Sequence, residues 1–237
     1  MELENIMSEL EALGTERTKA VYMRNGAREP LFGVATGAMK PLLKRIGRNQ
    51  PMAEALYATG NYDAMYLAGM VAEPTLMSET DFDRWLDAAY FNMISDYIVA
   101  VTLAETEAEF AQAVADRWIA SDVELRASAG WACYEWLLGS RPDREFDPDK
   151  LREMLERVAM TIHSQPERVK YSMNGFIIAV GVSYLPLHEE AVRAAAQVGA
   201  VDVRRGTTKC SVPLASGALR KAAEGGRLGF KRRNVRC

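Results

Sequence analysis

Two histidines and three cysteines are the residues of this 237-residue sequence best suited by type to acid–base, nucleophilic or metal chemistry. His163 follows a predicted helix and His188 opens another, which is typical of polar cap or surface residues. Cys133, Cys210 and Cys237 lack metal-ligand spacing, so we expect neither a metal site nor a cofactor. No Gly-rich phosphate loop or dinucleotide fingerprint occurs. Any chemistry must therefore use carboxylates, arginines and aromatic side chains.

Charge is unevenly distributed along the chain. The formal net charge is −3, but residues 15–48 carry +6 and residues 201–237 carry +8, whereas residues 49–125 carry −12. Clustered Lys and Arg side chains displace counterions from a polyanion, so the basic segments favour nucleic-acid binding. The alternative is that helices segregate charge on solvated faces.

The overall composition is that of a globular protein, with 49% hydrophobic and 26% charged residues. No apolar run reaches the roughly 18 residues of a membrane-spanning helix, so we expect no membrane association. The N-terminal sequence MELENIMSELEALG is acidic and amphipathic, unlike a secretory signal. Sparse cysteines are expected to be reduced thiols in a cytoplasmic protein.

Apolar residues recur at helical spacing through residues 1–200, and short Pro, Gly and Asx breaks separate the segments. Many helices joined by short loops predict an all-α solenoid of stacked helical hairpins. Strand signals are weak, the best being Lys209 to Pro213. The helices are expected at 3–13, 37–48, from Pro51 onward, and at 61–72, 79–90, 92–104, 107–119, 122–138, 148–163, 167–182 and 187–198.

A weak internal repeat supports this fold. GNYDAMYLAGM, SDVELRASAGW and PERVKYSMNGF each place a glycine (Gly69, Gly130, Gly175) before a bulky apolar residue. Gly130 and Gly175 are 45 positions apart, close to the HEAT-type period of about 40–47 residues. A glycine inside a helix costs about 1 kcal/mol relative to alanine, so we expect close helix packing at these positions.

The last 37 residues differ from the rest. One helix, Ala215 to Ala223, is expected between basic loops. We therefore divide the chain into a helical-repeat domain, 1–200, and a basic C-terminal extension, 201–237. The extension either trails the solenoid or packs on it and lines its concave face.

Over about residues 15–200 the sequence resembles the HEAT-like-repeat DNA alkylation repair proteins, the alkylpurine DNA glycosylases of the AlkC/AlkD type. The resemblance rests on YMRNGAREPLFGV with LLKRI, on FNMISDYI, on RWIASDVELRASAGW and on VKYSMNGFIIAVG. The terminal TKCSVP and GFKRRNVRC are similar to a subgroup with a basic tail. The resemblance implies a right-handed HEAT-like solenoid whose concave basic cleft binds duplex DNA, without a cofactor. We expect a monomer, because the sequence shows no obvious extra apolar face.

The resemblance also implies a reaction, hydrolysis of the N-glycosidic bond of purines alkylated at N3 or N7. Such a base is a good leaving group, so a carboxylate near the sugar provides the needed electrostatic stabilisation. By position, that carboxylate falls on Asp96, the backbone-gripping Arg on Arg126, and a cleft tyrosine on Tyr22. Further DNA contacts are expected from Arg24, Lys40, Lys44, Arg45, Lys170, Lys231, Arg232 and Arg233.

The sequence departs from the family pattern at two cleft positions. Two tryptophans that contact the damaged nucleotide in the family are replaced by Asn92 and Phe176. Phe176 still offers an aromatic face, whereas Asn92 does not. Trp85, Trp118, Trp131 and Trp136 have helical spacing that indicates core positions.

Three functions remain open at this point. The first is a glycosylase for alkylated purines that uses Asp96. The second is a non-catalytic protein that binds bent, branched or damaged duplex DNA through its backbone. The third is a helical-repeat scaffold for a protein partner, which the basic segments disfavour.

Overall fold

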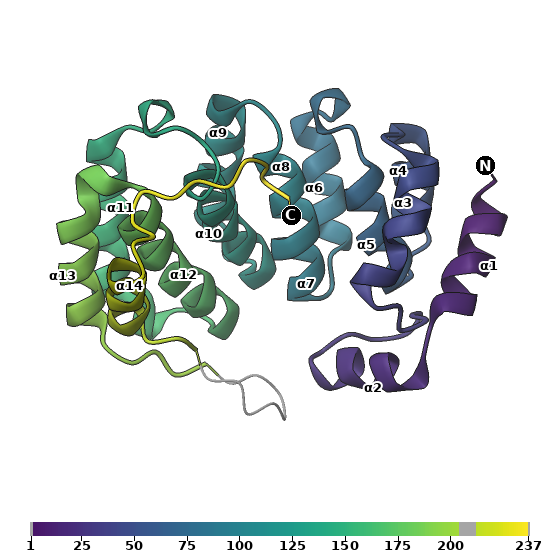
Figure 1. Ribbon diagram of the computed structural model, residues 1–237, viewed down its shortest axis with the longest axis horizontal. Helices are drawn as coiled ribbons and strands as arrows, with labels where there is room; N and C mark the ends of the chain where they lie inside the picture. Colours follow the sequence, from purple (N-terminus) through teal and green to yellow (C-terminus); the bar gives the residue numbers. More distant parts are fainter. Residues whose placement is uncertain (1, 204–211, 237) are drawn as a thin grey trace. The chain divides into compact units, whose positions relative to one another are not determined.

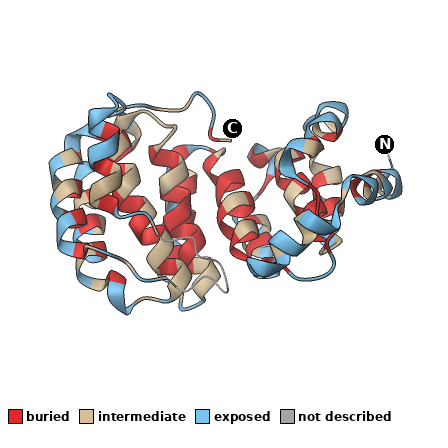
Figure 2. Ribbon diagram, turned by 60° about the horizontal axis from the view of Figure 1, so that its bottom comes forward, coloured by how far each residue is buried: buried red, intermediate tan, exposed pale blue. Residues whose placement is uncertain are grey.

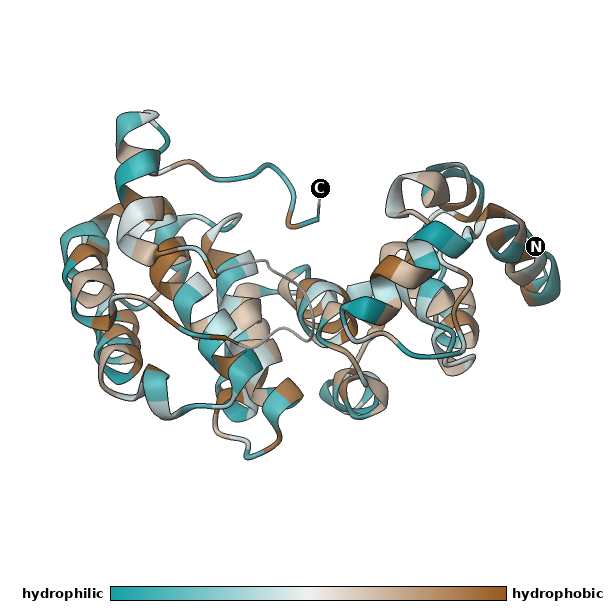
Figure 3. Ribbon diagram, turned by 90° about the horizontal axis from the view of Figure 1, so that it is seen from below, coloured by the Kyte–Doolittle hydropathy of each residue, from teal (hydrophilic) through white to brown (hydrophobic). Residues whose placement is uncertain are grey.

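The computed structural model describes residues 2–203 and 212–236, and every regular element in these ranges is helical (Figure 1). No described helix is long and apolar enough to cross a membrane. Hydrophobic and hydrophilic residues share most helices, as expected for elements that pack on one side (Figure 3). The helices are α1 Leu3–Leu13, α2 Glu16–Arg24, α3 Lys40–Ile46, α4 Gln50–Ala58, α5 Tyr62–Val71, α6 Glu79–Ala88, α7 Asn92–Ile94, α8 Ala100–Ala104, α9 Ala108–Ile119, α10 Glu124–Leu138, α11 Pro148–Thr161, α12 Glu167–Ser183, α13 His188–Val198 and α14 Ala215–Glu224.

The expected helices are confirmed within a few residues, with two corrections. Residues 92–104 are not one regular helix, because a π-helical turn at Ser95–Val99 separates α7 from α8. The predicted helix 37–48 begins as a 3₁₀ turn, Thr36–Met39, and ends at Ile46. The strand signal at Lys209–Pro213 and the thiols Cys210 and Cys237 lie wholly or mainly outside the described residues.

The described residues form two compact units, 2–102 and 103–203 together with 212–236. Buried residues gather on the facing sides of helices within each unit, while the outer faces are exposed (Figure 2). The expected division at residue 200 stays a prediction. Residues 212–236 pack on the helices of the second unit, and their lining of a concave face stays a prediction.

Local sequence explains the helix starts of the first unit. Asn49 and Asn61 cap α4 and α5 by accepting backbone N–H groups, and Ser78 forms a capping box with Asp81 at α6. Tyr57 stacks on the fully buried Trp85 with 4.1 Å between ring centroids. These caps and the stacked rings fix the α4–α5–α6 core.

A buried carboxylate fixes the loop that follows α2. Asp63 on α5 has no exposed surface and accepts hydrogen bonds from the backbone N–H groups of Phe32 at 2.6 Å, Gly33 at 2.9 Å and Val34 at 2.8 Å. Burial raises the pKa of Asp63, and the three N–H donors oppose that rise by favouring the charged form. A Cβ on Gly33, whose φ is 78°, would lie 2.5 Å from the backbone nitrogen of Lys19, so the tight approach requires glycine.

In the second unit, α10 is the central helix and packs on α9 and α12. A Cβ at Gly130 would lie 2.7 Å from the carbonyl oxygen of Ala115 on α9. At Gly175 it would lie 2.3 Å from the carboxylate of Glu135 on α10. The close packing expected at Gly130 is confirmed, whereas the space beside Gly175 is filled by the end of the Glu135 side chain. The buried hydroxyls of Ser128 and Ser172, 2.8 Å apart, add a polar link between α10 and α12.

The C-terminal segment lies along the second unit (Figure 1). Helix α14 packs on α12 and α13. A Cβ on Gly181 would lie only 2.5 Å from Cδ2 of Leu219 on α14, so the two helices are in close contact there. Beyond it, the backbone N–H of Gly229 donates to Val182 O, and that of Arg232 donates to Gly139 O, both at 2.7 Å. The segment thereby supplies donors to carbonyls near the ends of α12 and α10.

Basic side chains of this segment bind the protein itself. Lys231 donates to Leu138 O and pairs with Asp143, each at 2.8 Å. The guanidinium of Arg232 lies 4.6 Å from the ring centroid of Trp136. Trp136 was expected in the core, but it is partly exposed. Arg236 pairs with Glu105 at 3.2 Å, and of the Lys231-Arg232-Arg233 run only Arg233 is exposed. Lys231 and Arg232 thus hold the segment in place, a role that the sequence did not indicate.

We expect Gly130→Ala to destabilise the fold by about 1–3 kcal/mol, because its Cβ meets rigid backbone atoms of α9. Gly217 on α14 is the control: its Cβ would have one neighbour, at 3.9 Å, so Gly217→Ala should be neutral or stabilising. Denaturant unfolding measures both changes. Equal stability of the two variants would contradict the packing described for Gly130.

We also expect Lys231→Ala to reduce the unfolding free energy by about 1–2 kcal/mol, since it removes the ion pair with Asp143 and the hydrogen bond to Leu138 O. The exposed Arg233, two positions along, is the matched control and should tolerate alanine. Thermal and denaturant melts compare the two variants. A Lys231→Ala protein as stable as wild type would show that the segment is held by other contacts.

Candidate nucleic-acid interface

Asp96, the expected catalytic carboxylate, lies on the π-helical turn Ser95–Val99 of the first unit. It is 3% exposed, and its Oδ1 accepts a hydrogen bond from Ser95 Oγ at 2.7 Å. The turn packs on α5 and α6. A π-helical turn re-aims side chains relative to a regular helix and is frequent at functional sites, so this is the feature that sets Asp96 apart locally.

Asn92, one of the two substituted cleft positions, begins α7 and is 7% exposed. Its backbone oxygen accepts a hydrogen bond from Ser95 Oγ at 3.4 Å. Asn92 therefore occupies a buried position one turn before Asp96 and presents no aromatic surface.

An aromatic cluster is centred on Tyr62, the first residue of α5. The ring of Tyr62 lies 5.0 Å from that of Tyr22, 5.9 Å from Phe91 and 6.2 Å from Tyr66. Tyr22 also donates its hydroxyl to Val34 O at 2.9 Å, on the loop that Asp63 holds. Burial raises the pKa of Tyr22 and of Tyr62, so both rings stay neutral at physiological pH. The structure thus gives Tyr22 a fixed, half-buried place.

Four of the expected DNA-contacting cations lie in the first unit. Arg24 on α2 and Lys40 and Lys44 on α3 are exposed. Arg45 forms an ion pair with Glu9, and the neighbouring Arg48 donates to Ala72 O at 2.6 Å. Contacts of Arg24, Lys40 and Lys44 with phosphates stay a prediction, which their exposure allows.

The second unit carries Arg126 and Lys170. Arg126 is partly exposed near the start of α10, and its neighbour Glu124 accepts the backbone N–H of Arg168 at 2.8 Å. The carboxylate of Glu124 therefore caps α12, a role that the sequence did not reveal. Lys170 pairs with Glu167 at 3.2 Å and is 17% exposed.

Phe176 is fully buried, contrary to the expectation that it offers an aromatic face. Its ring lies 5.1 Å from Trp131 and 6.1 Å from Tyr134, with edge-to-face geometry in both pairs. Trp85, Trp118 and Trp131 are confirmed as core residues. Phe176 belongs to the same core, so in this arrangement no ring face is open to a nucleotide.

The histidines and the described cysteine lie at structural positions. His163 Nε2 lies 3.0 Å from Val198 O, and His188 Nδ1 lies 2.6 Å from Gly181 O, so both bond to carbonyls at helix ends. Burial raises the pKa of the Cys133 thiol, which keeps it protonated. Within residues 2–203 and 212–236, no group of three or more His, Cys, Asp or Glu side chains is arranged to hold a metal.

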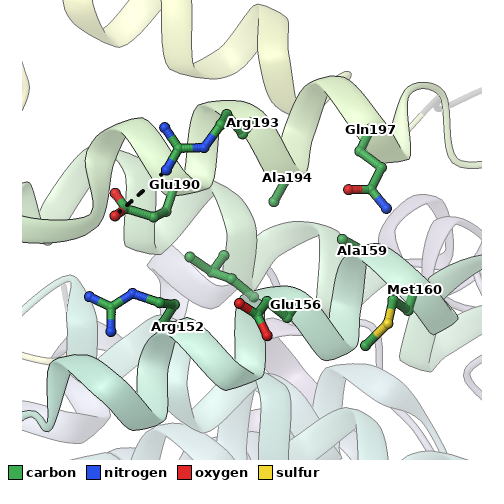
Figure 4. A pocket seen from close by; sticks show the side chains of 9 residues that line it. Arg152, Glu156, Ala159, Met160, Glu190, Arg193, Ala194 and Gln197 are labelled. Carbon is green, nitrogen blue, oxygen red and sulfur yellow. Dashed lines mark ion pairs between the residues drawn. The ribbon is translucent and has the colours of Figure 1, made fainter.

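Hollows on the surface of the second unit involve other residues. One, of about 620 Å³, lies between α11 and α13, with Arg152 and Met160 on one side and Glu190 and Arg193 on the other (Figure 4). Another, of about 770 Å³, is lined by carboxylates at the start of α9 and α11. Its five carboxylates, Glu107, Glu109, Asp116, Glu145 and Asp147, would repel a phosphate backbone.

Comparison with known proteins identifies the family. The sequence profile described as "DNA alkylation repair enzyme" matches residues 6–219. The uncharacterized proteins Lin0241 of Listeria innocua and Lmo0209 of Listeria monocytogenes are each 30% identical over 219 residues, 91% of this chain and 94% of their own length.

A solved structure is similar over 100% of both chains, with a TM-score of 0.94 and 59% sequence identity. It is described as "A new family of proteins related to the HEAT-like repeat DNA glycosylases with affinity for branched DNA structures". This match confirms the predicted all-α fold of HEAT-like hairpins. With the profile covering most of the sequence, the chain belongs to the DNA alkylation repair enzyme family.

Proposed function

We propose that the protein binds branched DNA in the bacterial cytoplasm, as a monomer, through the sugar–phosphate backbone. The observation that carries this proposal is the full-length similarity, at 59% identity, to a protein of a family with affinity for branched DNA structures. At that identity, the surface that meets DNA is expected to be shared as well as the fold.

The charges of the chain support a backbone interaction. Arg24, Lys40 and Lys44 are exposed in a segment with a net charge of +6. Such side chains contact phosphates of any sequence, and a branch point differs from linear duplex in the path of those phosphates. A protein that reads backbone shape needs no pocket for a base.

The environment of the two substituted cleft positions favours binding over base excision. Asn92 is nearly buried and not aromatic, and Phe176 is enclosed by Trp131 and Tyr134. The two aromatic walls that would hold an alkylated base are therefore lacking in the described arrangement. Recognition of DNA structure does not depend on those walls.

We expect the protein to bind a three- or four-way junction more tightly than a linear duplex of the same length. Affinity should fall steeply between 50 and 200 mM salt, and Lys44→Ala should lower the salt slope by about 1. Fluorescence anisotropy at several salt concentrations measures both effects. Arg193→Ala, an exposed residue of α13, is the matched control and should leave the slope unchanged. Equal affinity for junction and duplex would contradict the proposal.

Base excision is a second candidate function, which the placement of Asp96 favours. Asp96, held by Ser95 on a π-helical turn, supplies the negative charge that stabilises a positive charge developing on a deoxyribose. The reaction would be hydrolysis of the N-glycosidic bond of an N3- or N7-alkylated purine.

If this second function exists, wild type should release 3-methyl- or 7-methylpurines from methylated duplex DNA. Asp96→Asn should reduce the release at least about a hundredfold, because it removes the negative charge that stabilises the transition state. Chromatography of the free bases provides the measurement, and Asp87→Asn on α6 is the control. Release that is unchanged in Asp96→Asn would exclude Asp96 as the catalytic group, and no release by wild type would exclude excision of these bases.

A further inference from the structure

Arg28 and Tyr90 form a cation–π pair on the surface of the first unit. The guanidinium carbon of Arg28 lies 4.4 Å from the ring centroid of Tyr90. The Tyr90 hydroxyl donates back to Arg28 O at 3.3 Å, so each residue holds the other. Arg28 is exposed and Tyr90 partly exposed. A charged plane and an aromatic ring are thus presented together at the surface.

The loop that carries Arg28 is fixed on both sides of it. Glu29 forms an ion pair with Lys19 at 2.6 Å and accepts the backbone N–H of Leu31 at 3.2 Å. Gly26 has a φ of 110° and lies against the ring of Phe91, which a Cβ would approach to 3.2 Å. The position of Arg28 is therefore set before any ligand binds, which lowers the entropic cost of binding.

The position of Tyr90 is fixed by its neighbours in the chain. It follows α6 and precedes Phe91, whose ring belongs to the aromatic cluster with Tyr62. Burial raises the pKa of Tyr90, so its ring is neutral and electron-rich at physiological pH.

A flat ligand that is negatively charged at one end suits this pair. Unpaired nucleobases stack on tyrosine rings and on guanidinium planes, and the adjoining phosphate is attracted by arginine. In linear duplex DNA the base faces are covered by neighbouring pairs. At a branch point with unpaired nucleotides, they are open.

We propose that Arg28 and Tyr90 are a stacking platform for an unpaired nucleobase at a DNA branch point. This inference rests on the proposed binding of branched DNA. It assigns part of the preference for branches to base stacking, beyond backbone contacts. The platform tolerates any base, because every base offers a flat face.

The competing explanation is that the pair has only a structural role, because the Tyr90 hydroxyl also ties the loop to Tyr90 by its hydrogen bond to Arg28 O. The pair formed by Arg157 and Trp131 provides the comparison, with the guanidinium carbon 5.7 Å from the ring centroid. Trp131 is only 1% exposed, so no base can reach its ring. Arg157 is exposed, like Arg28.

The experiment compares two three-way junctions of identical length and charge. One has unpaired nucleotides at the branch, and in the other the same nucleotides are abasic. Wild type should bind the abasic junction about tenfold more weakly, because the phosphates remain and the bases do not. Tyr90→Ala and Arg28→Lys should bind both junctions equally, whereas Arg157→Lys should retain the wild-type difference.

Each other outcome has a defined meaning. If Tyr90→Ala and Arg28→Lys retain the tenfold difference, the platform is wrong. If wild type prefers junctions to duplex but binds both junctions equally, the platform is wrong while branched-DNA binding stands. If wild type does not prefer a junction to duplex, the proposed function fails and the platform with it. Arg28→Lys keeps the charge at an exposed site, so it provides a folded variant even if Tyr90→Ala unfolds.

Discussion

The carboxylate of Asp63 is the interaction on which the first unit depends. A charge without exposed surface is costly, and three backbone N–H groups of residues 32–34 offset that cost by charge-assisted hydrogen bonds. The same three bonds anchor the loop to α5. Tyr22 bonds to Val34 within that loop, and the segment with Arg28 leads directly into it. One buried carboxylate therefore positions the expected cleft tyrosine and the proposed stacking platform.

The second unit is organised by a different constraint, which is the close approach of backbones at α10. Gly130 lets α10 approach α9, and Gly175 accommodates the carboxylate of Glu135. The C-terminal segment then uses Lys231 and Arg236 to bind Asp143 and Glu105. The sequence suggests that these basic residues are available to DNA, but Lys231 and Arg236 form ion pairs within the protein. The exposed cations of the first unit are the proposed phosphate contacts.

Much of this fold could be predicted because helix positions depend on residues that are close together in the sequence. Helical periodicity and the short breaks predicted most helix positions, although not α2, and the glycine pattern predicted the close packing at Gly130. The π-helical turn at Ser95–Val99 could not be predicted, since nothing in its composition separates it from a regular helix. The burial of Phe176 depends on Trp131 and Tyr134 from another helix, and helical spacing does not say which face is enclosed. The roles of Lys231 and Glu124 depend on partners far away in the chain.

Hydrogen exchange with and without a three-way junction tests the central claim most directly, which is that DNA binds the first unit through its exposed cations. The account predicts slower amide exchange on junction binding in residues 22–44 and around Tyr90, and little change in residues 226–236. Protection confined to residues 226–236, with none in residues 22–44, would contradict it.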